Sequence, residues 1–170
     1  AKLIFKENIK NLLYLTNKKL IEELEEDLNG VNLDNDITTK NLFPKTVNIK
    51  CIISNRERMI LCGAKFIEYF LKKNFPRIKY QSLFRDGENI KKNSRIFILS
   101  GNAKIILGIE RTILNFLQHL SSISTTTHKF VTKMGKVETK LLDTRKTTIG
   151  LRKIEKYATF IGGAENHRIG

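Results

Sequence analysis

The first half of the chain alternates between apolar residues at helical spacing and short β-branched runs. Residues 7–28 carry apolar side chains three and four positions apart with charges between them, which predicts an amphipathic helix. Gly30 follows as a plausible helix C-cap. Residues 33–44 are rich in turn-forming residues and predict irregular chain, whereas the β-branched residues 47–54 predict a strand.

The next segment begins like a strand and then changes period. Residues 59–75 become an amphipathic helix from about Gly63, and this helix should end before Pro76. Two further strands are expected at 78–84 and 95–101, separated by a polar turn that contains Asp86-Gly87. Residues 1–101 therefore predict a helix and a small mixed sheet.

The pattern changes after residue 101. Residues 102–134 show long helical periodicity, and a break near 121–124 ("SSIS") predicts two helices there. Residues 139–143 form a short apolar run that predicts a strand, and residues 150–164 predict a helix stopped by Gly162-Gly163. Strand, loop, helix and glycine turn form the repeating unit of an α/β barrel or an open parallel sheet, so the fold class expected is α/β.

The composition narrows the possible environments and partners. Of 170 residues, 41% are hydrophobic and 28% are charged, as in globular proteins. No apolar run approaches the roughly 20 residues that span a bilayer, and the first ten residues do not resemble a signal peptide, so we expect a cytoplasmic protein without membrane contact. The net charge of +14 would attract polyanions, but the lysines are scattered, and a general lysine bias is the simpler cause.

The sequence pattern gives no catalytic or metal-binding role to the two cysteines or to two of the histidines. Cys51 and Cys62 lie in apolar surroundings and are not spaced as a CxxC pair, which predicts buried reduced thiols. His119 and His128 have no partners at metal-ligand spacing and are expected to be structural or exposed.

The sequence "LLDTRKTT" (141–148) is the strongest candidate site. In parallel α/β proteins, ligands bind at the carboxyl ends of strands, and this segment places Thr144, Arg145 and Lys146 at such an end. An arginine fork matches a carboxylate or phosphate in two places, and a lysine adds a compact charge. The alternative is an exposed loop whose cations pair with Asp143 or Glu155.

Two weaker clusters accompany it. His167 and Arg168 follow the double glycine and could bind an anion or move a proton, although a locally bonded histidine and a surface arginine are the commoner arrangement. Arg111 and Asn115 lie one turn apart on one helix face, which is either a solvated edge or faces a site or a partner subunit.

These clusters occur in an order that resembles a known family. The segments "ERTILNFLQHLSSIST", "LLDTRKTTIGLRKIEKYA" and "GGAENHRIG", together with "EEDLNGVNLDNDITTKNLFP" near the start, resemble the quinolinate phosphoribosyltransferases, which are type II phosphoribosyltransferases. Two positions depart from the family pattern: Ile149 replaces a proline, and Ala164 replaces a third glycine. The family also continues well beyond its "NHR" motif.

The resemblance implies a fold and an activity. The fold would be an α+β open sandwich domain at 1–105, followed at 106–170 by the first part of an incomplete α/β barrel. Family members convert quinolinate and phosphoribosyl pyrophosphate to nicotinate mononucleotide, pyrophosphate and carbon dioxide in NAD biosynthesis, with Mg²⁺ accompanying the pyrophosphate. The metal ligands are expected beyond Gly170, with none in this chain.

The resemblance also assigns residues and partners. The quinolinate-binding positions correspond to Thr144, Arg145, Lys146, His167 and Arg168, and Arg111 corresponds to an arginine contributed by the neighbouring subunit of a homodimer. No general base is assigned. Three alternatives stay open: a related enzyme that uses another ring acid such as nicotinate, an inactive fragment, and a basic nucleic-acid-binding module, whose binding would weaken steeply with salt.

Overall fold

The computed structural model describes the backbone of residues 2–28, 47–136 and 138–167, with side chains from Asn8 onward within these ranges. The turn-rich segment expected at 33–44, the cap expected at Gly30 and the candidate site residue Arg168 lie outside the described residues. The elements, in order, are α1 (Lys2–Asp27), β1 (Asn48–Ser54), β2 (Met59–Ile60), α3 (Ala64–Asn74), β3 (Lys79–Ser82), β4 (Asn89–Ile90), β5 (Arg95–Asn102), α4 (Ala103–Met134) and α5 (Arg152–Ile161). The mixture of helices and strands confirms the α/β class.

The strands form one antiparallel sheet and one short ribbon. β5 lies in the centre of the sheet order β1-β5-β3, with Asn48 opposite Asn102 and Tyr80 opposite Leu99. β2 and β4 pair only through Met59–Ile90 and Ile60–Asn89. The segment expected to be a plain polar turn between two strands therefore contains β4, because its backbone completes the hydrogen bonds of β2.

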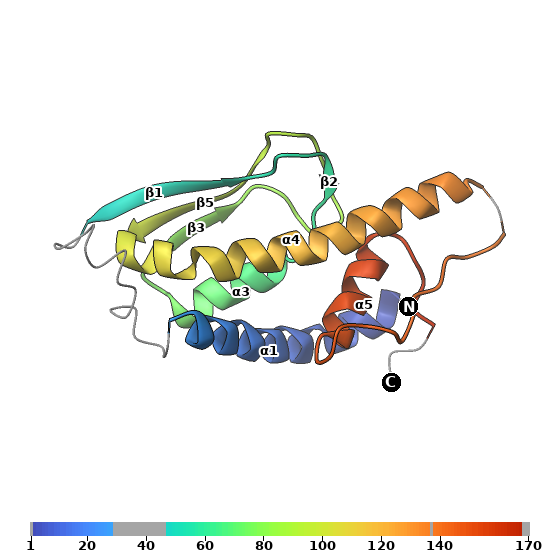
Figure 1. Cartoon of the computed structure of the whole chain (residues 1–170), viewed down its shortest axis with the longest axis horizontal. Helices are drawn as coiled ribbons and strands as arrows, with labels where there is room; N and C mark the ends of the chain where they lie inside the picture. Colours follow the sequence, from blue (N-terminus) through green and yellow to red (C-terminus); the bar gives the residue numbers. More distant parts are fainter. Residues whose placement is uncertain (1, 29–46, 137, 168–170) are drawn as a thin grey trace.

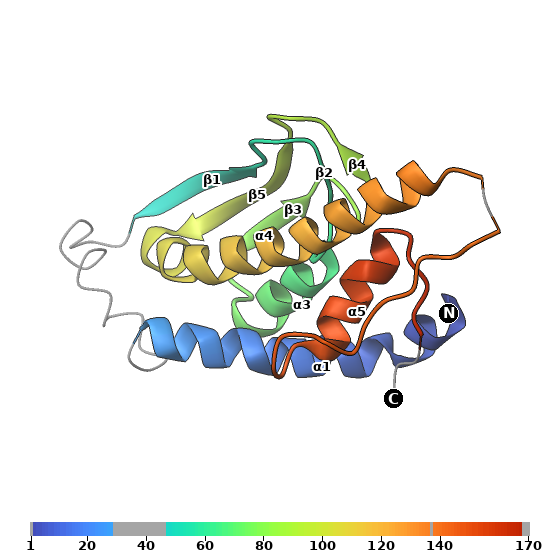
Figure 2. The same cartoon turned by 45° about the vertical axis from the view of Figure 1, so that its right-hand side comes forward.

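Three layers are stacked on one another. Helices α3 and α4 cover one face of the β1-β5-β3 sheet, and α1 lies on the side of these helices that faces away from the sheet (Figures 1 and 2). The core between the layers contains Phe70, Phe97 and Ile109, all fully buried. A second cluster, which includes Phe66, Leu120 and Tyr157, joins α3 and α4 to α5.

Helix α4 is a single helix of 32 residues, so the break predicted near 121–124 is wrong. The serines there face the backbone around β2. The hydroxyl of Ser121 accepts from the amide of Cys62 at 3.1 Å, and that of Ser124 donates to the carbonyl of Ile60 at 2.7 Å. Because these hydroxyls satisfy backbone groups of a neighbouring segment, they stabilise the packing of α4 and do not interrupt it.

The start of α4 also bears on domain organisation. The boundary expected between residues 105 and 106 falls in its first turn, where Asn102 caps the helix by accepting from the amides of Lys104 and Ile105. Ile106 and Ile113 belong to the core under the sheet. The division into residues 1–105 and 106–170 stays a prediction.

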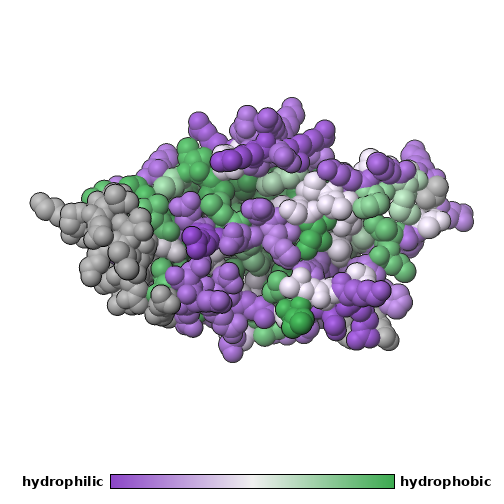
Figure 3. Space-filling view, in the orientation of Figure 1, coloured by the Kyte–Doolittle hydropathy of each residue, from purple (hydrophilic) through white to green (hydrophobic). Residues whose placement is uncertain are grey.

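Hydrophilic side chains cover much of the face shown in Figure 3, with separate apolar patches between them. No helix within the described residues is long and apolar enough to cross a membrane. Both cysteines are free: Cys62 is fully buried, as predicted, whereas Cys51 is only half-buried. Burial raises the pKa of the Cys62 thiol well above its usual value, so this residue stays protonated at neutral pH.

Candidate functional site

Two chain segments meet in parallel at the site. Leu142 forms a parallel bridge with Glu165; the Glu165 amide donates to the Leu141 carbonyl at 2.8 Å, and the Asp143 amide donates to the Glu165 carbonyl at 3.0 Å. The strand predicted at 139–143 is therefore reduced to this bridge. The parallel direction is the one that an α/β barrel requires, and both segments end at the same edge.

Asp143 connects the ends of these two segments. Its carboxylate accepts two hydrogen bonds from Nζ of Lys156, both at 2.7 Å, one from Nδ2 of Asn166 at 2.6 Å and one from the amide of His167 at 3.0 Å. The side chains of Lys156 and Asp143 are only 2% and 1% exposed. The segment that carries the candidate His167 is thus tied directly to the start of the loop that carries Arg145 and Lys146.

Glu155 holds the other end of this loop. One oxygen of its carboxylate accepts from the Thr148 amide at 3.1 Å, and the other lies 3.0 Å from Nε2 of His119 on α4. Residues 144–147, which we call the cationic loop, therefore lie between two contacts made by consecutive residues of α5.

Both carboxylates are held in the ionised form. Burial alone would raise the pKa of Asp143, but the hydrogen bonds from Lys156, Asn166 and the His167 amide outweigh it, and the pKa is lowered. The pKa of Glu155 is lowered in the same way, because the contacts with Thr148 and His119 outweigh its burial. The two acids therefore carry full charge at neutral pH, and each is already engaged.

Because Asp143 and Glu155 bind other groups, the positive charges of the cationic loop are not neutralised by them. Thr144, Arg145 and Lys146 are exposed, and within the described part of the chain no carboxylate pairs with either cation. The alternative in which they pair with Asp143 or Glu155 is wrong, because those groups bind Lys156 and His119. The loop has internal order, since the Thr144 hydroxyl accepts from the Lys146 amide at 3.0 Å. It can therefore offer two cations to an anionic ligand.

The loop returns to α5 through a tight turn. The Leu151 amide donates to the Thr148 carbonyl at 3.1 Å, and Gly150 has a φ of 79°, so residues 148–151 have the features of a type II turn. Ile149 occupies the second position of the turn, where proline is common, and it is 99% exposed. The departure from the family pattern at Ile149 thus retains the turn.

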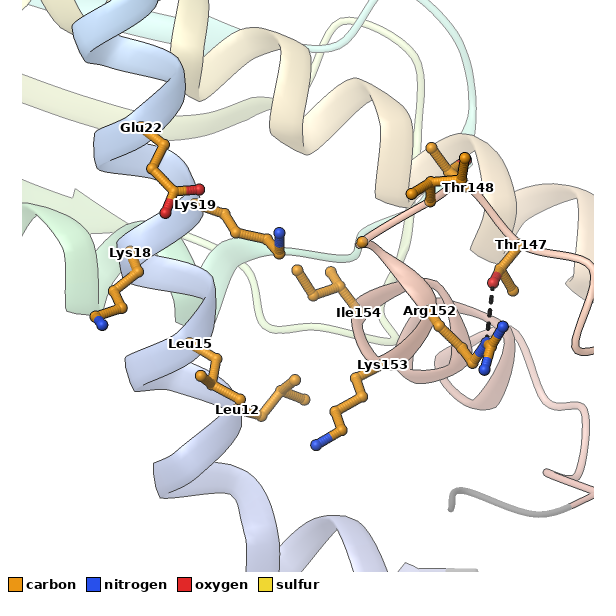
Figure 4. Close-up of a pocket in the computed structure, with 12 residues that line it drawn as sticks. Leu12, Leu15, Lys18, Lys19, Glu22, Thr147, Thr148, Arg152, Lys153 and Ile154 are labelled. Carbon is orange, nitrogen blue, oxygen red and sulfur yellow. Dashed lines mark hydrogen bonds between the residues drawn. The ribbon is translucent and has the colours of Figure 1, made fainter.

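A cavity of ≈ 580 Å³ borders the side of this turn that faces α1 (Figure 4). Lys18 and Lys19 of α1 line one wall, and Arg152 and Lys153 of α5 line another, with Nε of Arg152 lying 3.4 Å from the hydroxyl of Thr147. None of the candidate substrate residues that the structure describes lines this cavity. The cavity separates α1 from residues 147–150. The hydrogen bonds that hold the ends of the cationic loop therefore come from α5.

The remaining candidates lie apart from the loop. Arg111 is on α4, its side chain is 75% exposed, and its Nη1 lies 3.5 Å from Oδ1 of Asp27 on α1. His119, the α4 residue that contacts Glu155, is eight residues further along, or about 12 Å along the helix axis. Arg111 therefore belongs to a different surface from the cationic loop of its own chain.

The described residues offer no metal site. No three His, Cys, Asp or Glu side chains among them lie together in a way that could hold an ion. Asp143 and Glu155, the acids closest to the cationic loop, already bind protein donors. Among the described residues, the acids beside the cationic loop are therefore engaged by the protein and are not assigned to a metal.

Sequence motifs do not reveal the supports of the site. No motif marks Lys156 or Asn166, and Glu155 enters only as an alternative partner for the loop cations. Lys156 lies 13 positions from Asp143, a separation at which no regular helix or strand spacing indicates contact. The available signal was a lysine and a glutamate in a helix that is otherwise apolar between Ile154 and Ala158.

The fold and the cationic loop define an α/β protein with exposed cations at the carboxyl ends of two parallel segments. Enzymes with an α/β barrel bind their substrates at this end of their strands. The family comparison is more specific. The model of the quinolinate phosphoribosyl transferase N-terminal domain matches residues 36–121, and that of the C-terminal domain matches residues 123–170. The chain belongs to the quinolinate phosphoribosyl transferase family, which confirms the resemblance found in the sequence.

Individual relatives agree with this assignment. A probable nicotinate-nucleotide pyrophosphorylase (carboxylating) of Methanocaldococcus jannaschii is 42% identical over 135 residues, which are 78% of this chain and 46% of the relative. The solved nicotinate-nucleotide pyrophosphorylase of Francisella tularensis superposes with a TM-score of 0.84 at 40% identity, over 93% of this chain and 54% of that one. Human nicotinic acid phosphoribosyltransferase, at 10% identity and a TM-score of 0.61 over 81% of this chain and 36% of its own, shares the fold alone. The chain thus spans about half the length of the first two relatives.

Proposed function

We propose that this chain supplies the dicarboxylate-binding part of an enzyme that transfers a phosphoribosyl group from phosphoribosyl pyrophosphate to quinolinate. The observation that carries the proposal is the cationic loop, whose Arg145 and Lys146 have no acid partner among the described residues and stand at the same edge as His167. Relatives that match most of this chain carry the corresponding names. A dicarboxylate provides two negative groups, which suits a site with adjacent cations.

The reaction begins at the ribose. Pyrophosphate leaves the anomeric carbon with the bonding electron pair, and positive charge of the oxocarbenium type develops on the sugar. The ring nitrogen of quinolinate then donates its lone pair to that carbon. The ring becomes cationic, and this charge stabilises the electron pair that stays on C2 when the 2-carboxylate leaves as carbon dioxide. C2 then takes up a proton from solvent. The products are nicotinate mononucleotide, pyrophosphate and carbon dioxide.

The residues of this chain would act by binding and orientation. The guanidinium of Arg145 can hold one carboxylate in two places, while Lys146 places a point charge beside it, with Thr144 as a further hydroxyl. His167 would contact the substrate from the second segment, and Arg168 is proposed from the motif alone. Fixed cations favour a bound dianion and hold its ring nitrogen toward the sugar.

Other parts of the proposal rest on the family resemblance. Arg111 would reach the site of a second subunit in a homodimer, which agrees with its exposure and its distance from its own cationic loop. Mg²⁺ would accompany the pyrophosphate and be held by residues outside those described. We propose a cytoplasmic location, although relatives in plants carry chloroplastic and mitochondrial designations.

The test compares Arg145→Ala and Lys146→Ala with the unaltered protein in the intact gene product. Formation of nicotinate mononucleotide and quinolinate binding by calorimetry are measured. Both substitutions should weaken quinolinate binding by about 10-fold or more, since each removes a charge-assisted contact. Lys92→Ala, which removes another exposed lysine from a loop remote in sequence, is the matched control and should bind normally. Unchanged quinolinate affinity in both loop variants would overturn the assignment.

A second measurement separates the proposal from its closest rival. If the ring acid were nicotinate, nicotinate would compete with quinolinate at comparable concentration and would itself be converted. Weak competition by nicotinate supports a site built for two carboxylates.

A further inference from the structure

Helix α5 makes two contacts with the cationic loop through consecutive residues. Lys156 binds Asp143, immediately before the loop, and Glu155 binds the amide of Thr148, immediately after it. Neighbouring helix residues point about 100° apart, so one turn of α5 can reach both ends of the loop. The four loop residues lie between these two contacts, and Arg145 and Lys146 are in the middle.

We propose that Glu155 and Lys156 are positioning residues that set the geometry of substrate binding by holding both ends of the cationic loop. This inference rests on the proposed function for its consequence, because the loop must bind quinolinate for its geometry to matter. Neither side chain need touch the substrate. Glu155 and Lys156 act through the backbone at Thr148 and through the carboxylate of Asp143.

The burial of the Lys156–Asp143 pair gives this support its strength. Both side chains are almost completely removed from water, and the carboxylate receives four hydrogen bonds. A buried, fully bonded pair resists displacement, because any movement would leave a charge without a partner in a medium of low polarity. The same carboxylate also receives the His167 amide, so Lys156 fixes the position of the second substrate-binding segment relative to the first.

Helix α5 is itself anchored to two other elements. Glu155 contacts His119 of α4, and the hydroxyl of Tyr157 donates to Asp86 at 2.8 Å, in the turn that precedes β4. Three consecutive residues of α5 thus join the cationic loop to α4 and to the sheet-bearing part of the chain. By contrast, the opposite side of residues 147–150 borders the cavity, where α1 offers no such support.

The experiment uses four variants of the intact gene product. Lys156→Met removes the charge but keeps a long side chain, whereas Lys153→Met makes the same change at an exposed position of the same helix and is the matched control. Glu155→Leu removes the acceptor for the Thr148 amide, whereas Glu155→Gln retains an acceptor and should restore function. If Lys156→Met fails to fold, the two Glu155 variants still test the proposal.

Two readouts distinguish the support from its consequence. Hydrogen exchange measured by mass spectrometry over residues 143–150 should be several-fold faster in Lys156→Met and Glu155→Leu, because each variant removes one of the two contacts that hold the cationic loop. The KM for quinolinate should rise about 10-fold to 100-fold in these two variants, because a small misplacement of binding groups is costly, with little change in the KM for phosphoribosyl pyrophosphate. Lys153→Met and Glu155→Gln should resemble the unaltered protein in both measurements.

The possible failures can be told apart. Unchanged exchange in both Lys156→Met and Glu155→Leu would overturn the two-point support, whatever the protein binds. Faster exchange with an unchanged KM for quinolinate, or a loss confined to the fraction of folded protein, would overturn the positioning role. If the unaltered protein neither binds nor converts quinolinate, the proposed function is wrong. The proposed effect of Glu155 and Lys156 on quinolinate binding is then wrong as well.

Discussion

The hydroxyl of Tyr157 donates a 2.8 Å hydrogen bond to Oδ2 of Asp86, across 71 positions of the sequence. The other oxygen of Asp86 accepts from the Ala64 amide at 2.8 Å, at the start of α3. One carboxylate thus connects α5 with the first turn of α3. The pKa of Tyr157 is raised by burial and by the nearby Asp86 charge, so its hydroxyl keeps the proton that it donates.

Asp86→Asn should change how stability depends on pH. Burial raises the pKa of Asp86 despite the hydrogen bonds from Tyr157 and the Ala64 amide. Since the folded protein binds this proton more tightly than the unfolded chain, the contribution of Asp86 is fully present below about pH 3.9, the unfolded pKa, and is lost as the pH rises through the folded value. The unaltered protein should therefore gain stability relative to the variant between pH 7 and pH 4.

Urea denaturation at several pH values measures this difference. Asparagine keeps the shape of the side chain and an acceptor for the Ala64 amide, and the comparison cancels the titration of Asp143 and Glu155. A stability difference that is the same at every pH would contradict the raised pKa of Asp86.

Breaking the buried ion pair should be far more costly than replacing it. Lys156→Met leaves the Asp143 charge buried with one partner fewer, which should lower the free energy of unfolding by about 3–5 kcal/mol. The double variant Asp143→Asn with Lys156→Met contains no unpaired charge and should recover much of that loss. Denaturant unfolding of both single variants and the double variant gives the coupling energy, and simple additivity would show that the two groups do not support each other.

Ile149→Pro should stabilise the turn beside the cationic loop. Ile149 occupies the second position of the turn closed by Leu151 and Thr148, and proline sets the backbone angle needed there. Among the described residues, no hydrogen bond of the Ile149 amide would be lost. A gain of about 0.4–1 kcal/mol is expected, because proline restricts the unfolded chain.

The matched comparison is Gly150→Ala at the next position. Alanine at this position would have to adopt a φ of 79°, which side chains with a Cβ disfavour, and its Cβ would lie 3.2 Å from Nζ of Lys19. This variant should therefore lose stability. Thermal unfolding of both variants measures the pair of effects. Destabilisation by proline would show that the turn is of another type.

Ser121→Ala should destabilise the protein although it is conservative in size. It leaves the buried Cys62 amide without its acceptor, at a cost of about 1–3 kcal/mol. Ser122→Ala is the control on the same helix, because Ser122 is exposed and its hydroxyl donates to the Gln118 carbonyl of its own helix. Equal stabilities for the two variants would show that the contact with Cys62 contributes nothing.

Regular periodicity made most of the fold predictable. The helical spacing at 7–28 and the β-branched run at 47–54 correspond to α1 and β1, and the helix expected after Gly63 is α3. The break expected at "SSIS" failed for a physical reason. Serine only weakly disfavours a helix, and here the hydroxyls of Ser121 and Ser124 bond to the backbone of a distant segment, which no local pattern reveals.

The candidate site was predictable to a similar extent. The placement of Thr144, Arg145 and Lys146 at the end of an extended segment followed from the pattern, whereas a shared site with His167 was implied by the family resemblance. The structure ties the His167 amide to Asp143, directly before the loop. The groups that hold them were not predictable. Lys156 and Asn166 meet Asp143 only because the chain turns back through a helix and a glycine turn, and single-sequence patterns do not encode that approach.

Helix α4 has a mechanical consequence. Its 32 residues extend about 48 Å, with one half packed under the sheet and the other carrying α5. A rod of this length, tilted by about 5° around its midpoint, moves each end by about 2 Å. A partner that presses on the exposed face around Arg111 would therefore act on a lever whose far arm displaces the glycine turn after α5. Gly162 and Gly163 lie there against Thr127 and Val131, so events at one surface are felt at the other without any hinge.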